Sequence, residues 1–237
     1  MLPDTRFDGH FLGAQGRTWR PGTPLHAIAP VLPDNGRPVR GTIVVVNGIM
    51  TDVKLQQADL QALANTGARV VGIHNATEGL VRDMGQVLTD KLGSGPNPAV
   101  DAVVRLLRTE LGAGRPVHLA GHSQGALIIA RALSIVGPSL SKAQLERVTV
   151  ETFGGAASRW IDGPKYTHYV NRFDPAPWLL GVGTPFTRRG GDTRDVWFDE
   201  VRPPRGLPSL VGGVTNFFAR VVDRLVHGAP EYFAQRG

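Results

Sequence analysis

The sequence predicts an α/β protein with a mostly parallel β-sheet that is flanked by helices on both faces. Short apolar runs rich in β-branched residues, typical of strands buried on both faces, alternate with segments of helical periodicity. This alternation runs through most of the chain, and no internal repeat or low-complexity tract interrupts it. Ligands of such sheets bind at the carboxyl ends of the strands, so functional residues are expected there.

Length and composition indicate one domain over residues 1–237. The chain has 41% hydrophobic and 19% charged residues, which is ordinary for a soluble globular enzyme. No apolar run approaches the roughly 18 residues of a membrane span, and residues 1–10 do not have the pattern of a signal peptide. We therefore expect a soluble protein, cytoplasmic by default. The absence of cysteine excludes disulfides, thiolate catalysis and cysteine-ligated zinc.

The net charge of +6 comes mainly from arginines. Such a surface favours anionic partners, either phospholipid headgroups or nucleic acid, although a solvated arginine-rich surface is the simpler interpretation. We expect no nucleic-acid partner, because basic and aromatic residues are not interleaved. Neither H-E-x-x-H nor a calcium-type acidic loop is present, so we expect no metal and no cofactor. Nothing in the sequence indicates an oligomeric state.

The first half of the chain begins with a glycine- and proline-rich extension over residues 1–40, which predicts irregular structure or a short hairpin. Strands follow from β-branched apolar runs, and helices follow from apolar residues three and four positions apart. The expected elements are a strand at Thr42–Val46, a helix at Lys54–Thr66, a strand at Arg69–Ile73, and helices at Thr77–Leu92 and Ala99–Leu111.

The second half contains a strand that starts at Val117, a turn around Ser123 and a helix of small and apolar residues that reaches about Val136. Three short strands and a closing helix are expected after it, at Val148–Phe153, Tyr166–Asn171, Asp195–Phe198 and Val214–Val226.

The segment Gly121-His122-Ser123-Gln124-Gly125 predicts a nucleophile elbow. In this turn a serine is forced into a strained strand-to-helix connection, which requires small residues two positions before and after it. Ser123 is therefore the candidate nucleophile; the alternative is a tight turn with a solvated serine. His122 is expected to pack beside the elbow rather than to titrate in the mechanism.

With these motifs, residues 41–233 resemble the α/β-hydrolase superfamily, most closely its lipases and esterases. The resemblance implies a triad in the order Ser, then Asp or Glu, then His. His227 is the one histidine of the chain that fits this order, and its surroundings are similar to the H-x-x-Y region of fungal-type lipases with the spacing changed by one residue. The alternative is a helix-end histidine with Gly228 as C′ residue and Asp223 as an i,i+4 partner.

The resemblance also implies the acid and the oxyanion donors. Asn171–Pro177 is similar to the N-x-x-D-P-V-P stretch of fungal-type lipases, so Asp174 is the expected acid that orients the imidazole. The alternative is an Asp-Pro turn, with Asp192 and Asp199 in reserve. The expected donors are the backbone N–H of Gln124 and that of Ile49, with Met50 as the alternative; Asn47-Gly48 stands where many relatives have His-Gly.

These features predict a serine hydrolase that cleaves carboxylic esters of lipids or other apolar acyl groups through an acyl-enzyme. Trp178, Leu179 and Met50 are expected to contact the substrate. Residues 175–194 form a possible lid or cleft loop, and Arg188 and Arg189 in it would attract anionic headgroups of a membrane. The alternatives are a fixed loop with Trp178 in the core, a thioesterase or amidase with the same triad, and a non-catalytic interaction protein.

Overall fold

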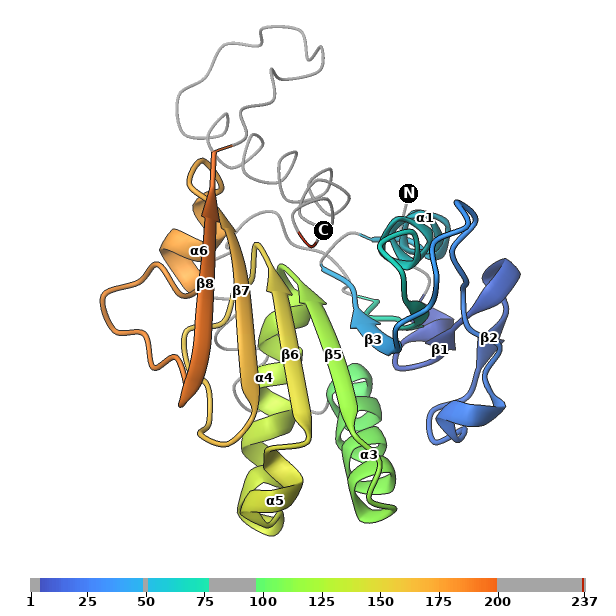
Figure 1. The fold of residues 1–237 in the computed structure, drawn as a ribbon, viewed down its shortest axis with the longest axis horizontal. Coiled ribbons are helices and arrows are strands. Elements are labelled where there is room, and N and C mark those ends of the chain that lie inside the picture. The colour runs from blue at the N-terminus through green and yellow to red at the C-terminus, as the bar shows by residue number, and fades with distance from the viewer. Residues whose placement is uncertain (1–4, 49–50, 77–96, 200–235, 237) are drawn as a thin grey trace, which may run out of the picture.

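The computed structural model describes residues 5–48, 51–76, 97–199 and 236, and these form an eight-stranded sheet (Figure 1). Its strands follow the order β2-β1-β4-β3-β5-β6-β7-β8. Strands β3 to β8 are parallel, whereas β1 pairs antiparallel with β2 and β4. The bounds are β1 Phe11–Leu12, β2 Thr18–Trp19, β3 Thr42–Val46, β4 Arg69–Ile73, β5 Val117–His122, β6 Val148–Phe153, β7 Lys165–Asn171 and β8 Asp192–Phe198. The predicted fold class is confirmed.

Helices cover both faces of the sheet. The side chains of α3 and α4 join those of Val44 and Val46 in one apolar cluster, while α1 packs with Ile43 and Val45 on the opposite face. Alternate residues of β3 thus point to opposite buried faces, which explains its uninterrupted apolar sequence. The helices are α1 Val53–Ala64, α3 Pro98–Gly112, α4 Gln124–Val136, α5 Lys142–Leu145 and α6 Pro175–Leu180, with 3-10 turns at Thr5–Phe7, Ala14–Gly16, Leu25–Ala27 and Gly137–Ser139.

Several boundaries differ from the expected ones. The N-terminal extension contains the short β1-β2 hairpin, and the hairpin joins the sheet edge through β4. Strand β8 begins at Asp192, three residues earlier than expected, and α6 occupies part of the segment expected to be a loop. Helix α5 was not expected either; its N-terminus is capped by a capping box between Ser141 and Gln144. The helices expected at 77–92 and 214–226 lie outside the described residues.

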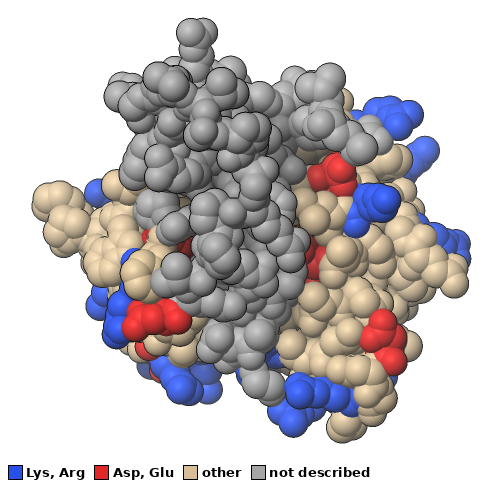
Figure 2. Space-filling view, turned by 90° about the horizontal axis from the view of Figure 1, so that it is seen from above, with Lys and Arg blue, Asp and Glu red and all other residues tan. Residues whose placement is uncertain are grey.

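The charges of the described surface are mixed. Seen from above, Lys and Arg side chains are spread around the edge of the molecule with Asp and Glu between them (Figure 2). In the part of the chain that the structure describes, no helix is both long enough and apolar enough to cross a membrane.

Candidate active site

Ser123 connects the end of β5 to the start of α4 in a strained conformation. Its φ of 51° and ψ of −117° lie in a region of backbone conformation that residues other than glycine rarely adopt. Gln15 is the only other non-glycine residue with positive φ within the described ranges. The serine is 4% exposed. The strand-turn-helix context expected for this serine is therefore present.

The neighbouring glycines explain why this turn is possible. A Cβ atom at Gly125 would lie 2.0 Å from the carbonyl oxygen of Val46, and one at Gly121 would lie 2.6 Å from the amide nitrogen of Ala126. Both contacts involve backbone atoms, which cannot rotate away as a side chain can. The first turn of α4 therefore packs directly on the end of β3 and leaves no room for larger residues.

Backbone hydrogen bonds join this turn to the loop after β6. The amide of Ser123 donates to the carbonyl of Phe153 at 3.0 Å, and the amide of Ala156 donates to the carbonyl of Ser123 at 3.0 Å. The same loop also contacts the end of α6, because a Cβ atom at Gly181 would lie 2.0 Å from the carbonyl oxygen of Gly155. The serine turn and the helix that follows Asp174 are thus held against one common loop.

Asp174 follows β7 at the carboxyl edge of the sheet and is 6% exposed. It is the N-cap of α6, since one carboxylate oxygen accepts a hydrogen bond from the amide of Ala176 at 2.9 Å. Asp192 instead begins β8, at the opposite edge of the sheet, and the exposed Asp199 pairs with Arg172 at 3.0 Å. Among these three acids, Asp174 alone combines burial with a position at the strand ends.

Two described histidines near the sheet are unsuited to proton transfer at neutral pH. Burial lowers the pKa of His122 to about 4, and burial followed by the charge of Arg189 lowers the pKa of His168 to about 3. Both rings are therefore neutral near pH 7. This agrees with the expectation that His122 packs beside the elbow. His227 lies outside the described residues.

The loop after β3 lies next to the serine. A Cβ atom at Gly48 would be 3.1 Å from the Cβ of Ser123 and 3.2 Å from Nδ1 of His122. Gln124 is the first residue of α4, so its backbone amide belongs to the helix N-terminus. Ile49 and Met50 lie outside the described residues.

A buried amide network links the two sides of this region, and the sequence did not reveal it. Asn47 follows β3, Asn75 follows β4, and both are 3% exposed. Asn47 Nδ2 donates to the carbonyls of Gly48 and Asn75 at 2.9 and 3.0 Å, while its Oδ1 accepts from the amide of Asn75 at 2.7 Å. Asn75 Nδ2 donates to Oε1 of Gln124 at 2.7 Å. The signal available in the sequence was an asparagine after each of two buried strands.

Three exposed apolar side chains lie close to Asp174 in the chain. Phe173, Trp178 and Leu179 are 47%, 45% and 60% exposed. Trp178 does not enter the core: its ring packs against that of Trp197 with centroids 5.2 Å apart, and its Nε1 donates to the carbonyl of Arg172. Two of the predicted substrate contacts, Trp178 and Leu179, thus lie on one short helix beside the predicted acid.

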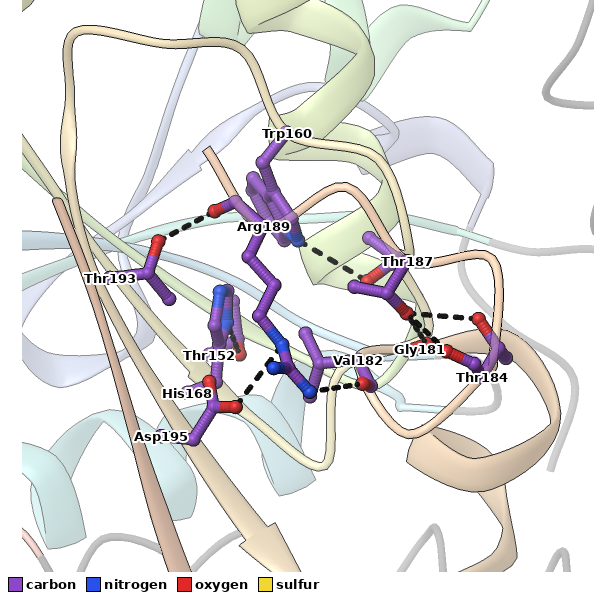
Figure 3. A network of polar contacts seen from close by, with 11 residues as sticks. Thr152, Trp160, His168, Gly181, Val182, Thr184, Thr187, Arg189, Thr193 and Asp195 are labelled. Atoms are coloured by element: carbon purple, nitrogen blue, oxygen red, sulfur yellow. Dashed lines mark hydrogen bonds and ion pairs between the residues drawn. The ribbon is translucent and has the colours of Figure 1, made fainter. Parts of the chain in front are cut away.

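The segment 175–194 is attached to the body of the protein at Arg188 and Arg189. The backbone of Arg188 exchanges hydrogen bonds with residues 158–160, at 2.7 and 2.8 Å, and its side chain pairs with Asp162 at 2.8 Å. Arg189 lies between Asp195 and Val182 (Figure 3), with an ion pair of 3.2 Å to the former and a hydrogen bond to the carbonyl of the latter. Both arginines therefore have carboxylate partners, and motion of this segment as a lid stays a prediction.

Among the solved structures similar to this chain is an α/β serine hydrolase without lid from Xanthomonas campestris, at 18% identity and a TM-score of 0.45 over 86% of each chain. A thioesterase of the prodiginine pathway of Streptomyces coelicolor is 14% identical, with a TM-score of 0.42 over 82% of this chain and 86% of that one. A dienelactone hydrolase from Anabaena variabilis is 14% identical, with a TM-score of 0.38 over 86% and 88%. No protein-family model and no curated protein matches the chain.

Proposed function

We propose that the protein is a serine hydrolase with Ser123 as its nucleophile. The observation that carries this proposal is the backbone of Ser123, held at positive φ between β5 and α4 by two glycines that admit no side chain. A strained non-glycine residue is retained where the surrounding structure demands it, and such residues concentrate at functional sites. A serine in a strand-to-helix turn of this kind presents its hydroxyl at the carboxyl edge of the sheet.

In the proposed reaction, Ser123 Oγ attacks the acyl carbonyl while His227 accepts its proton. Asp174 orients the imidazole and stabilises the imidazolium, and the amides of Gln124 and Ile49 stabilise the oxyanion. His227 then protonates the leaving group, and an acyl-enzyme remains. Water activated by His227 releases the acid and regenerates the serine. The buried position of Asp174 supports its part in this scheme.

For the substrate we propose a carboxylic ester with an apolar acyl group. The exposed side chains of Phe173, Trp178 and Leu179 support this choice, because they offer apolar contact area beside Asp174. Rates on p-nitrophenyl esters should rise from acetyl to octanoyl chains. A panel of matched oxygen esters, thioesters and anilides, each assayed with Ser123→Ala as control, separates an esterase from a thioesterase or amidase.

A covalent probe tests the proposal most directly. A fluorophosphonate should label the folded wild-type protein, and peptide mass mapping should place the adduct on Ser123. The Ser123→Ala variant should stay unlabelled and inactive, with an unchanged circular dichroism spectrum. If folded wild-type protein is not labelled, the chain is a non-catalytic protein with this fold.

We further propose peripheral contact with an anionic membrane surface through the segment 175–194. Exposed Phe186, Trp178 and Leu179 would provide apolar contact there. Arg188 and Arg189 would add electrostatic attraction of about 1 kcal/mol each, reduced by their partners Asp162 and Asp195. Sedimentation with anionic and neutral vesicles, for wild type and an Arg188→Glu, Arg189→Glu double variant, tests this. Equal partitioning in all four cases would exclude the contact.

A further inference from the structure

The buried amides of Asn47, Asn75 and Gln124 join the segments that follow three adjacent strands. The sheet order places β4, β3 and β5 side by side, and the three residues follow these strands within three positions of each strand end. Each is 5% exposed or less. Buried amides of this kind hold backbone segments in one arrangement, because any other arrangement leaves polar groups without partners.

Asn47 is the centre of this network, and its orientation is fixed by backbone groups. Both hydrogens of Nδ2 are directed to carbonyl oxygens, those of Gly48 and Asn75, and Oδ1 accepts from the amide of Asn75. An inverted amide would place oxygen against two carbonyl oxygens, so only one orientation fits. Asn47 therefore fixes the carbonyl of Gly48.

Asn75 extends the network to the N-terminus of α4. Its Nδ2 donates to the side chain of Gln124, whose backbone amide is the second expected donor. Gly48 in turn lies against Ser123. The same buried amides thus tie Gly48 to the residue that carries an expected oxyanion donor, Gln124, beside the nucleophile.

We infer that Asn47 and Asn75 are positioning residues for the oxyanion site: together they set the separation of Gly48 from Gln124 at the N-terminus of α4. This inference rests on the proposed function. Neither residue contacts the reacting atoms. They act through the backbone amide of Gln124, whose placement decides how strongly the oxyanion is bound in the transition state.

The isosteric substitution Asn47→Asp tests this role. It replaces Nδ2 by a carboxylate oxygen of the same size, which faces the carbonyls of Gly48 and Asn75 and repels both. Loss of one oxyanion donor lowers kcat by about 10²- to 10³-fold, so we expect a fall in this range with KM changed less than about twofold. Asn97→Asp is the matched control, because Asn97 caps α3 through Oδ1, which an aspartate retains. The control should keep wild-type kcat.

A second readout separates positioning from general structure. A trifluoromethyl ketone with a short alkyl chain forms a tetrahedral adduct with the serine, and its oxyanion requires the same donors. Its inhibition constant should rise in Asn47→Asp by about the same factor by which kcat falls, whereas inhibition by a carboxylic acid product should stay unchanged. If Asn47→Asp does not fold, Asn75→Ala, which removes the bond to Gln124, should lower kcat about tenfold at unchanged KM.

The outcomes are distinct. Folded variants that keep wild-type kcat and ketone affinity, or that lose only thermal stability, would overturn the positioning role while leaving Ser123 as the nucleophile. A wild-type protein that is not labelled by fluorophosphonate would instead overturn the proposed function, and the positioning role with it.

Discussion

Nε of Arg236 donates to both carboxylate oxygens of Glu151, at 3.0 and 2.9 Å, on the face of the sheet that α1 covers. Nη1 of the same arginine donates to Thr66, and His118 contacts Glu151 at 2.7 Å. The group borders a cavity of about 330 Å³ that includes neither Ser123 nor Asp174. These contacts join β6 to Arg236, 85 residues later in the chain.

Removal of Arg236 should destabilise the protein in a pH-dependent way. Burial opposes the charge of Glu151, but His118 and Arg236 outweigh it, so the pKa of Glu151 lies below its ordinary value of 4.5. The stabilisation is therefore fully present above about pH 4.5 and is lost as pH falls through the lower folded pKa. We expect Arg236→Ala to cost about 3 kcal/mol at pH 7 and less at pH 3.5.

Urea denaturation between pH 3.5 and 8 measures this difference. Lys142→Ala, which removes an exposed ion pair of 3.8 Å with Glu146, is the control and should change stability by less than about 0.5 kcal/mol. A loss for Arg236→Ala that is equal at all pH values would show that the ion pair with Glu151 is not its cause.

Asp59 should affect the free energy of unfolding with the opposite pH dependence. It lies on α1 with 8% exposure, and burial raises its pKa from the ordinary 3.8 to about 7. The unfolded chain therefore releases this proton more readily, and the carboxyl costs stability increasingly from pH 3.8 up to about pH 7. Asp59→Asn should raise the free energy of unfolding by on the order of 2 to 4 kcal/mol at pH 8 and by almost nothing at pH 4. Denaturation at both pH values, with the exposed Asp34→Asn as control, checks the sign.

Much of the fold was predictable because its signals are local. After a polar first residue, Thr42 or Arg69, the residues of β3 and β4 are apolar or glycine, because these strands are buried on both faces. Strand β8 is only half-buried, and its first three residues Asp192, Thr193 and Arg194 are polar. The strand predicted from the apolar pattern therefore started three residues too late. Helix α6 was missed because residues 175–194 were expected to form a loop as a whole, although proline is favoured in a first helical turn after an aspartate N-cap.

The site was predictable in part for the same reason. The glycines that the elbow requires lie within two positions of Ser123, so a short sequence motif indicates the turn. The amide network and the bond between Glu151 and Arg236 join residues 28 to 85 positions apart, and no periodicity encodes such pairs. The places of Asp174 and His227 in a triad stay predictions, and His227 lies outside the described residues.

Asp174→Asn should lower kcat by orders of magnitude with little effect on stability. Asparagine keeps an oxygen that caps α6 through Ala176, but it cannot stabilise the imidazolium of the proposed triad. Asp199→Asn is the control, since it breaks only the exposed pair with Arg172 and should leave kcat within about twofold. Esterase assays of both variants test the assignment of Asp174 as the acid. A large loss of kcat in Asp199→Asn alone would show that the acid of the triad is Asp199, after the end of β8.

Gly125→Ala should prevent stable folding of the elbow. Its new methyl group would meet the carbonyl oxygen of Val46 at 2.0 Å, and neither backbone can move without separating α4 from β3. We expect a loss of at least about 3 kcal/mol. Gly112→Ala, at the end of α3 with no atom within 4 Å of the added Cβ, should be neutral or slightly stabilising. Thermal melts compare the two, and a wild-type melting temperature for Gly125→Ala would contradict the packing described.

Ser123→Gly should be more stable than Ser123→Ala, although both are expected to be inactive. The φ of 51° and ψ of −117° cost a residue with a Cβ atom about 1 to 3 kcal/mol, whereas glycine reaches this region without that cost. Glycine also gains entropy in the unfolded chain, which offsets up to about 1 kcal/mol of the relief. Alanine removes the hydroxyl but keeps the strain, so the difference between the two variants isolates the backbone. Urea denaturation should favour the glycine variant by about 1 kcal/mol. Equal stabilities would mean that the turn is unstrained, and the conformation of Ser123 would then give no support to a nucleophile at this position.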